Sequence, residues 1–264
     1  MTEASGKEAL GRRAMPFVLL GIAAFILFAL LTLPARVALG WLAPAQARIE
    51  GISGTLWRGR AEHLQWQELR LGRIEWRLHP AALLGAHLRA DITLTRVDGF
   101  ARATVATGGN GHLHFTDLTA SLPLNALSAT PLADGWSGTL NFKFADLRLD
   151  RGWPIQAAGR LDAVAINGPM GGSAGRPVDA GSYQIDFTSA EGGTQKAPPT
   201  GTLIDTGGPL QVTGSVQFLD DRSYVIEGLV ALRPEASPDI VQALRFLGPA
   251  DAQGRRPFSL AGSF

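Results

Sequence analysis

The chain has 264 residues, a formal net charge of +1, no cysteine, 32 glycines and 16 prolines. The small net charge excludes a protein whose overall field recruits nucleic acid, and the lack of cysteine excludes disulfide bridges, cysteine-ligated zinc sites and thiol chemistry. Glycine is well above its average share of roughly 7%, and a glycine-rich chain with short apolar runs favours a β architecture.

The first predicted element is a transmembrane helix over residues 14–35, which contain no charged side chain. At 1.5 Å per residue this helix spans roughly 33 Å, enough to cross a hydrocarbon core of about 30 Å. The alternative is a cleavable signal peptide, whose apolar core is usually shorter and ends at a small-x-small site. The nearest good site, Ala45–Ala47, lies far beyond the apolar run. We therefore predict an uncleaved anchor.

Basic residues set the expected orientation of this anchor. Lys7, Arg12 and Arg13 crowd its N-terminal side, whereas Arg36 and Arg48 follow it more sparsely. Because cytoplasmic flanks are the more basic ones, we predict a single-pass membrane protein with its N-terminus in the cytoplasm. The expected segments are a cytoplasmic tail (1–13), the transmembrane helix (14–35), an interfacial stalk (36–47) and an exported β domain (48–264).

Beyond the stalk, apolar and polar side chains alternate with a period of two, which is typical of strands with one buried face. Clusters rich in glycine and proline separate the alternating runs and predict turns. The clearest runs are 74–78, 88–94, 140–144, 183–187, 210–218 and 224–232, followed by a last strand over 258–264. Residues 191–200 are predicted to form a surface loop.

One short helix is predicted near the C-terminus, over residues 238–247. Ser237 can cap it, Pro238 suits its first position, and Asp239 suits the positive end of its dipole. Apolar residues at helical spacing form one stripe, and Gly248–Pro249 predict its end.

Glycines recur at the centres of several predicted strands and indicate how the sheet is shaped. Gly-Thr-Leu occurs at 54–56, 138–140 and 201–203, and single glycines stand at 159, 214, 228 and 262. Within a strand, glycine marks a bulge or a tight bend. The predicted fold class is therefore all-β: a curved, partly open groove of antiparallel strands, preceded by the transmembrane helix and carrying the short C-terminal helix.

No residue pattern supports a catalytic, cofactor-binding or metal site. His112 and His114 share a face of a strand, but two ligands with no carboxylate at metal-binding spacing make a poor metal site. The glycine-rich stretch 171–175 lacks the residues that close a phosphate loop and is expected to be a loop. Asp220 and Asp221 are expected in a turn. We therefore predict that the protein is not an enzyme and uses no cofactor.

A stretch rich in tryptophan and arginine is the first predicted contact surface. Both residue types are enriched in interface hot spots. The alternative is that the tryptophans fill the core of a first hairpin while the arginine stems lie across them. The candidate residues are Trp57, Arg58, Trp66, Trp76 and Arg77.

The terminal strand is the second predicted contact surface, at Phe258, Leu260 and Phe264. A sheet that bends without closing leaves an edge with free N–H and C=O groups, which accept a partner strand unless they are blocked. Arg255 and Arg256 are the only charged side chains next to this strand that would discourage pairing with another strand.

The same stretches carry a resemblance to a known family. The apolar N-terminal segment is followed by Gly-Thr-Leu-Trp-x-Gly at 54–59, Trp-Arg-Leu-x-Pro at 76–80, paired leucines at 83–84 and Leu-Gly-Pro at 247–249. This pattern resembles the type II secretion system protein N family. The resemblance implies a non-enzymatic accessory or scaffold component in the inner membrane of a Gram-negative bacterium, where it supports export of folded proteins from the periplasm.

The resemblance implies contacts with other envelope subunits of the type II secretion system, and the anchor implies contact with inner-membrane lipid. No nucleic acid partner is expected, and a homo-oligomer is left open.

The anchor and the strands that contain glycine also resemble membrane-anchored β-groove proteins of the AsmA type. Those proteins move lipid across the periplasm, which gives an alternative function. A lipid conduit needs a continuous apolar lining, whereas a scaffold needs a filled core and an accessible edge.

Overall fold

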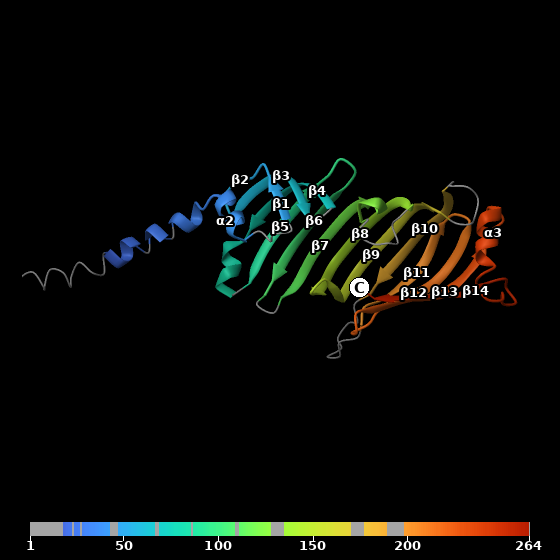
Figure 1. The fold of residues 1–264 in the computed structure, drawn as a ribbon. Coiled ribbons are helices and arrows are strands. Elements are labelled where there is room, and N and C mark those ends of the chain that lie inside the picture. The colour runs from blue at the N-terminus through green and yellow to red at the C-terminus, as the bar shows by residue number, and fades with distance from the viewer. Residues whose placement is uncertain are drawn as a thin grey trace, which may run out of the picture.

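The strands form one open antiparallel sheet of 14 strands, with short helices (Figure 1). The computed structural model describes residues 18–22, 24–26, 28–42, 47–66, 69–85, 87–108, 111–127, 135–169, 177–188 and 198–263. The strands are β1 (Ala47–Glu50), β2 (Ser53–Gly54), β3 (Arg58–Trp66), β4 (Leu69–Leu78), β5 (Leu88–Thr95), β6 (Phe100–Thr107), β7 (His112–Pro123), β8 (Ser137–Asp150), β9 (Trp153–Gly168), β10 (Val178–Phe187), β11 (Thr200–Gly207), β12 (Leu210–Phe218), β13 (Ser223–Leu232) and β14 (Arg256–Ser263).

The connectivity is a meander in which strands that follow one another in the chain also pair in the sheet. The exception is β2, which pairs with β3 off the main path, so that β1 reaches β3 directly. The two edges of the sheet are β1 and β14. All the runs predicted from alternation lie within strands, including the last one, which the structure describes up to Ser263.

The register of the strands separates polar from apolar side chains. Successive residues of a strand point to opposite faces, so residues directly opposite one another across the sheet share a face. One row from β3 to β14 contains no polar side chain: Ala61, Ile74, Leu94, Ala101, Ala120, Phe142, Leu161, Ile185, Leu203, Gly214, Gly228 and Phe258. The adjacent row is polar throughout: Arg60, Glu75, Thr93, Arg102, Thr119, Lys143, Arg160, Asp186, Thr202, Ser215, Glu227 and Ser259.

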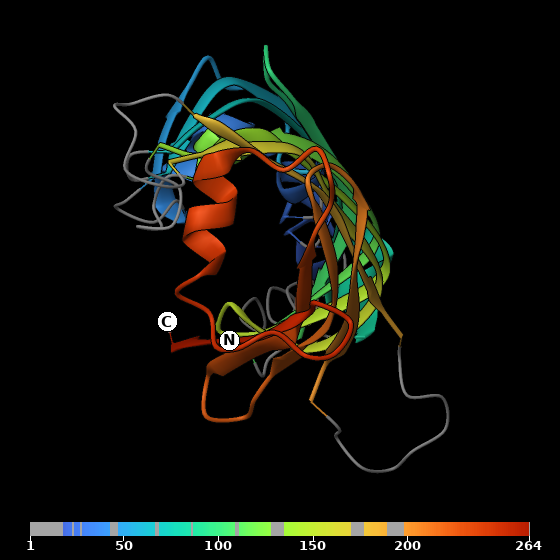
Figure 2. The ribbon, with the colours of Figure 1, turned by 90° about the vertical axis from the view of Figure 1, so that its right-hand side faces the viewer.

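The sheet is curved, and it bends toward the side on which α3 (Pro238–Leu244) lies (Figure 2). Gly214 and Gly228 are directly opposite each other on β12 and β13. A Cβ added at Gly214 would lie 2.3 Å from the carbonyl oxygen of Glu227, so the two backbones approach too closely there for a side chain. The glycines that predicted a bend therefore lie where neighbouring strands need the space.

Large buried side chains are concentrated in the C-terminal part of the sheet. Ile240 and Leu244 of α3 pack on the apolar face of β11–β13, against Leu203, Leu210, Val212, Val216 and Val230. A second cluster joins β8, β9 and β10 through Phe144, Ala157 and Phe187. Before residue 135, by contrast, the buried hydrophobic residues of the described segments are all alanines: Ala35, Ala38, Ala61, Ala103 and Ala120.

The C-terminal helix begins as predicted but ends earlier. The Ser237 hydroxyl accepts a hydrogen bond from the Ile240 N–H, and Pro238 occupies the first turn. The helix ends at Leu244, three residues before the predicted end. The N–H groups of Arg245, Phe246 and Leu247 each bond to the carbonyl three residues earlier, so the chain tightens into turns rather than continuing the helix.

Two further helical features precede and interrupt the sheet. Helix α2 (Ala35–Leu42) occupies most of the segment that was expected to be a stalk. Single 3-10 turns, η1 (Pro80–Gly85) and η2 (Leu124–Leu127), follow β4 and β7. Within 48–264, α3 is the one α-helix among the described residues, in agreement with the sequence.

The predicted transmembrane helix is described only in part. Residues 18–22, 24–26 and 28–31 are helical, and their large apolar side chains are strongly exposed, for example 71% for Phe25 and 67% for Leu20. Among the helices of the described residues, none combines the length and the apolar character that a membrane crossing requires. The membrane crossing over 14–35 therefore remains a prediction.

Several other expectations concern residues outside the described part of the chain. They include Phe264, the loop predicted at 171–175 and most of the loop predicted at 191–200, although Thr200 already belongs to β11. Asp220 and Asp221 do form the turn between β12 and β13. There the Asp221 carboxylate accepts a 3.0 Å hydrogen bond from the Ser223 N–H.

Candidate functional site

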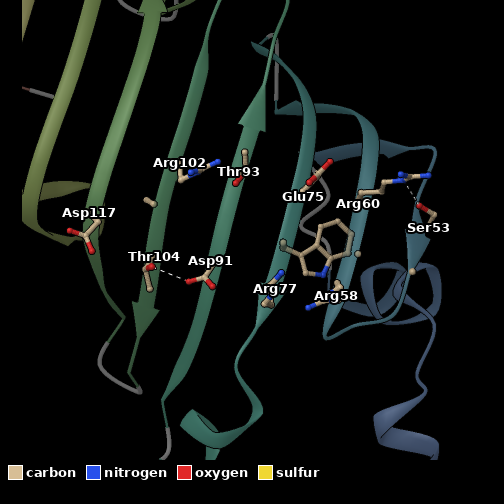
Figure 3. A pocket seen from close by; sticks show the side chains of 14 residues that line it. Ser53, Arg58, Arg60, Glu75, Arg77, Asp91, Thr93, Arg102, Thr104 and Asp117 are labelled. Carbon is tan, nitrogen blue, oxygen red and sulfur yellow. Dashed lines mark hydrogen bonds between the residues drawn. The ribbon is translucent and has the colours of Figure 1, made fainter.

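Charged side chains of neighbouring strands β3–β7 line an open cavity of about 850 Å³ (Figure 3). Side chains two residues apart in a strand share a face, so the polar halves of these alternating strands converge on it. The charged members are Arg58, Arg60, Glu75, Arg77, Asp91, Arg102 and Asp117, and Trp76 also lines the cavity. Three residues of the predicted contact surface, Arg58, Trp76 and Arg77, thus meet at one site.

Arg58 and Arg77 lie directly opposite each other on β3 and β4, and both are exposed. Neither guanidinium makes a hydrogen bond or ion pair with any residue that the structure describes. Arg60, by comparison, donates from Nε to the Ser53 hydroxyl at 3.1 Å. The cavity therefore contains two adjacent cations whose guanidinium groups have no hydrogen-bonded partner among the described residues, although the Asp91 carboxylate lies opposite Arg77 and interacts with its charge.

Asp91 is the carboxylate opposite Arg77, but its oxygens are already occupied. One oxygen lies 2.9 Å from His79 Nε2, and the other accepts a 2.9 Å hydrogen bond from the Thr104 hydroxyl. Partial desolvation raises the pKa of Asp91, but the hydrogen bonds from His79 and Thr104, with the nearby positive charges, outweigh it and leave the pKa below its ordinary value. Asp91 therefore stays ionised without forming a hydrogen bond to Arg77.

The tryptophans tie this site to the N-terminal helix. Trp57 Nε1 donates to the carbonyl of Leu30 at 2.8 Å, and Trp76 Nε1 donates to the carbonyl of Leu56 at 3.0 Å. Both indoles are half-buried and bonded within the chain, which favours the structural alternative, while their role in contacts with a partner stays a prediction. Trp66 ends β3, and its side chain is outside the described part of the chain.

The second predicted contact surface is at the other edge of the sheet. Phe258 and Leu260 belong to β14, which pairs with β13 and forms the edge. Phe258 is half-buried and packs against the cluster beneath α3, whereas Leu260 is 48% exposed. The two predicted surfaces are therefore at opposite ends of the sheet and do not form a common site.

The histidines of β7 pair with carboxylates that the sequence spacing did not reveal. His114 pairs with Asp146, and His112 Nδ1 lies 3.8 Å from Asp150, both partners coming from β8. The two histidines are half-buried rather than fully exposed. No group of three or more potential metal ligands converges among the described residues.

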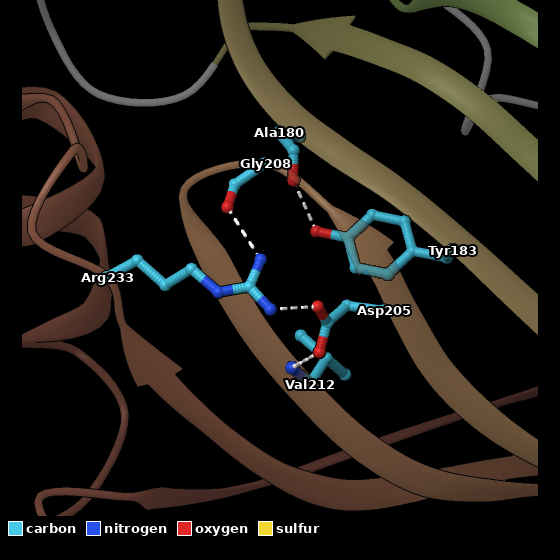
Figure 4. Close-up of polar contacts among 6 residues, drawn as sticks. All are labelled: Ala180, Tyr183, Asp205, Gly208, Val212 and Arg233. Atoms are coloured by element: carbon cyan, nitrogen blue, oxygen red, sulfur yellow. Dashed lines mark hydrogen bonds and ion pairs between the residues drawn. The ribbon is translucent and has the colours of Figure 1, made fainter.

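A partly buried ion pair joins three strands beside α3 (Figure 4). Arg233, just after β13, pairs with Asp205 of β11 and donates to the Gly208 carbonyl at 2.8 Å. Asp205 also accepts a 2.8 Å hydrogen bond from the Val212 N–H, and Tyr183 donates to the Ala180 carbonyl nearby. Burial, followed by the charges of Asp205 and Asp179, raises the pKa of Tyr183 to about 12.

The sequence named only part of the charged cavity. Asp91, Arg102 and Asp117 come from strands whose polar residues looked like an ordinary solvent-facing side. The available signal was the alternation itself, since Asp91 and Thr93 are polar positions of the predicted run 88–94. The pairing of β4, β5 and β6, which brings these residues beside Arg58 and Arg77, is a tertiary property.

Comparison with known proteins identifies the family. The model of the family described as type II secretion system (T2SS), protein N, matches residues 45–259. This chain belongs to that family. The type II secretion system protein N of Vibrio cholerae is 29% identical over 264 residues, covering 95% of this chain and 99% of the relative. The corresponding protein of Aeromonas hydrophila is 26% identical over 248 residues, covering 91% and 95%. No solved structure gives a significant match.

Membership of the type II secretion system protein N family confirms the resemblance seen in the sequence and makes the chain a component of this secretion system of the Gram-negative envelope. The family match spans β1 to the first half of β14 and therefore includes the charged cavity and the beginning of the terminal edge strand.

Proposed function

We propose that this protein is a non-enzymatic accessory scaffold of the type II secretion system, held in the inner membrane by residues 14–35 and acting by contact with other envelope subunits. The observation that carries the proposal is the open sheet, whose terminal strand β14 forms an edge. An unpaired edge offers a row of N–H and C=O groups to a partner strand. Membership of the family supports partners within the secretion system.

The exposed apolar helix supports the anchoring part of the proposal. Its described side chains are apolar and open on several sides, which is the pattern of a helix surrounded by lipid. An anchored scaffold also meets other membrane subunits at raised effective concentration, so modest contacts suffice.

The sequence of β14 indicates which of its backbone N–H groups are available to a partner strand. Pro257 is opposite Leu229 and has no N–H to donate to β13. Because inward and outward N–H groups alternate along a strand, those of Ser259 and Ala261 are expected to point away from β13. Removing one outward N–H should then weaken strand addition without removing a bond inside the sheet.

The test uses the full chain in cells with a photocrosslinking residue at Ser263. We expect a crosslink to another secretion-system subunit, lost in Ala261→Pro and kept in Ala261→Val, which retains the N–H. Both variants should keep the melting temperature of the parent chain. A crosslink and full secretion in a folded Ala261→Pro variant would exclude the edge as the contact.

A second function, lipid carriage, is favoured by one specific observation. The apolar row runs from β3 to β14, and several of its members before β8, such as Ile74 and Leu94, are only half-buried. A surface of this kind suits an acyl chain. The test is whether lipid co-purifies with the chain. Lipid that is present in the parent and in Thr93→Glu, on the opposite face, but absent from Leu94→Glu would favour lipid carriage over a scaffold.

A further inference from the structure

The opposed arginines of the charged cavity are energetically unfavourable as they stand. Like charges directly opposite each other on neighbouring strands destabilise a sheet, and Arg58 and Arg77 are such a pair. The nearest opposed carboxylate, Asp91, is engaged by His79 and Thr104. An anion lying between the two guanidinium groups would turn this repulsion into attraction.

This arginine pair lies next to the end of the apolar N-terminal helix. The turn that leads into Arg58 contacts that helix and the residues directly after it. The Trp57 indole donates to the Leu30 carbonyl of the helix, the Leu56 N–H donates to the Leu33 carbonyl at 2.9 Å, and Thr55 forms an isolated β-bridge with Pro34. If the helix is surrounded by hydrocarbon, its end lies at the level of the lipid headgroups, since the phosphates border the hydrocarbon core.

We propose that Arg58 and Arg77 together bind the phosphate of an anionic phospholipid headgroup at the membrane surface beside the helix. The proposal rests on the anchoring described under the proposed function and adds a specific ligand class and site. Guanidinium groups bind phosphate through paired, charge-assisted hydrogen bonds, and two of them from adjacent strands can contact one phosphate. Arg60 and Arg102 line the same cavity and increase its attraction for negative charge.

The binding test uses the full chain reconstituted in vesicles of equal phosphatidylglycerol and phosphatidylcholine, followed by mass spectrometry of the lipid that stays bound. We expect phosphatidylglycerol to be enriched at least about tenfold, since hydrogen bonds to charged groups are among the stronger ones. Arg58→Gln/Arg77→Gln should lose the enrichment, and Arg58→Lys/Arg77→Lys should keep part of it. Arg151→Gln/Arg245→Gln is the matched control, because both residues are exposed and do not line the cavity: Arg151 lies in the turn between β8 and β9, and Arg245 directly follows α3.

A stability measurement separates binding from folding. Without anionic lipid, the melting temperature of Arg58→Gln/Arg77→Gln should equal or exceed that of the parent chain, because the repulsion is gone. Short-chain phosphatidylglycerol should then raise the melting temperature of the parent and not of the variant. The proposal would be overturned if inorganic phosphate or an acidic peptide raised the melting temperature of the parent while phosphatidylglycerol did not. That result would assign the site to another anion.

The outcome for the anchor is read independently. If the chain stays in the membrane fraction but shows no preference for phosphatidylglycerol, the headgroup site is wrong while the anchor stands. If the chain is recovered in the soluble fraction, the anchoring itself fails, and with it the reason for a lipid ligand.

Discussion

The two halves of the sheet are built from the same alternating pattern but are stabilised very differently. From β8 onward, valine, leucine, isoleucine, phenylalanine and tryptophan side chains are buried, and α3 covers part of their face. In the described residues before β8, the buried hydrophobic side chains are those of alanine alone. Burial of a large apolar side chain contributes about 1.5–3 kcal/mol, whereas an alanine methyl contributes far less. We therefore infer that the C-terminal half is the more stable part of the fold, because the larger apolar side chains of the N-terminal half are at most partly buried.

The largest expected effect is the loss of an aromatic side chain in the C-terminal half. Phe187 is 7% exposed and lies between Phe144 and Phe218, with ring centroids 5.8 Å and 6.0 Å away. Phe187→Ala should lower the free energy of unfolding by about 3–5 kcal/mol in a urea titration. Phe115→Ala, at a half-buried position of β7, is the matched change in the N-terminal half and should cost clearly less. Equal losses of unfolding free energy in the two variants would contradict the inferred difference in stability between the halves.

The ion pair beside α3 should show the next largest effect. Asp205 is 7% exposed at its side chain, so Arg233→Met would leave its carboxylate with the Val212 N–H as a partner but without its cation. We expect a loss of about 2–3 kcal/mol in the free energy of unfolding. The control is Arg160→Met, which removes the cation of the exposed pair with Asp186 and should change stability little. A larger loss at Arg160 would contradict the assignment.

Trp57→Ala should destabilise the fold less than Phe187→Ala. Trp57 is half-buried, so the cost of about 3–5 kcal/mol that applies to a fully buried large aromatic falls to about 1–2 kcal/mol. Trp57→Phe keeps an aromatic ring but removes the hydrogen bond to Leu30. Both variants should increase hydrogen exchange in the turn before β3 while β8–β13 stay protected. Loss of protection throughout the sheet would show that the N-terminal half is more strongly coupled than we infer.

The smallest predicted effect is a dependence on high pH. The folded state raises the pKa of Tyr183 to about 12, above its ordinary value of 10.0, because burial disfavours the phenolate. The unfolded chain therefore loses this proton first, and stability that is fully present below pH 10 declines as the pH rises toward 12. Tyr183→Phe should flatten this part of a stability profile, and Tyr224→Phe should leave it as in the parent chain. A decline unaffected by Tyr183→Phe would assign it to another group.

Much of the architecture could be predicted because it depends on local spacing. Alternation in 74–78 or 224–232 requires a strand with two unlike faces, whatever the strand pairs with. Ser237 and Pro238 likewise start α3 through contacts within one turn. The end of α3 was predicted less well, because tightening after Leu244 depends on how the following chain turns back toward β14.

The sequence by itself determined the family and the β character, and it indicated bends at glycines within strands; the two contact surfaces that it named stay predictions. Only the tertiary structure decided which residues share a site, because a cavity such as that around Arg58 and Arg77 depends on the register between strands. Register also explains why the Asp91 carboxylate, although directly opposite Arg77, accepts its hydrogen bonds from His79 and Thr104, which come from two other segments of the chain. Side-chain spacing along a strand is fixed by backbone geometry, whereas contacts across strands depend on the packing of the whole sheet.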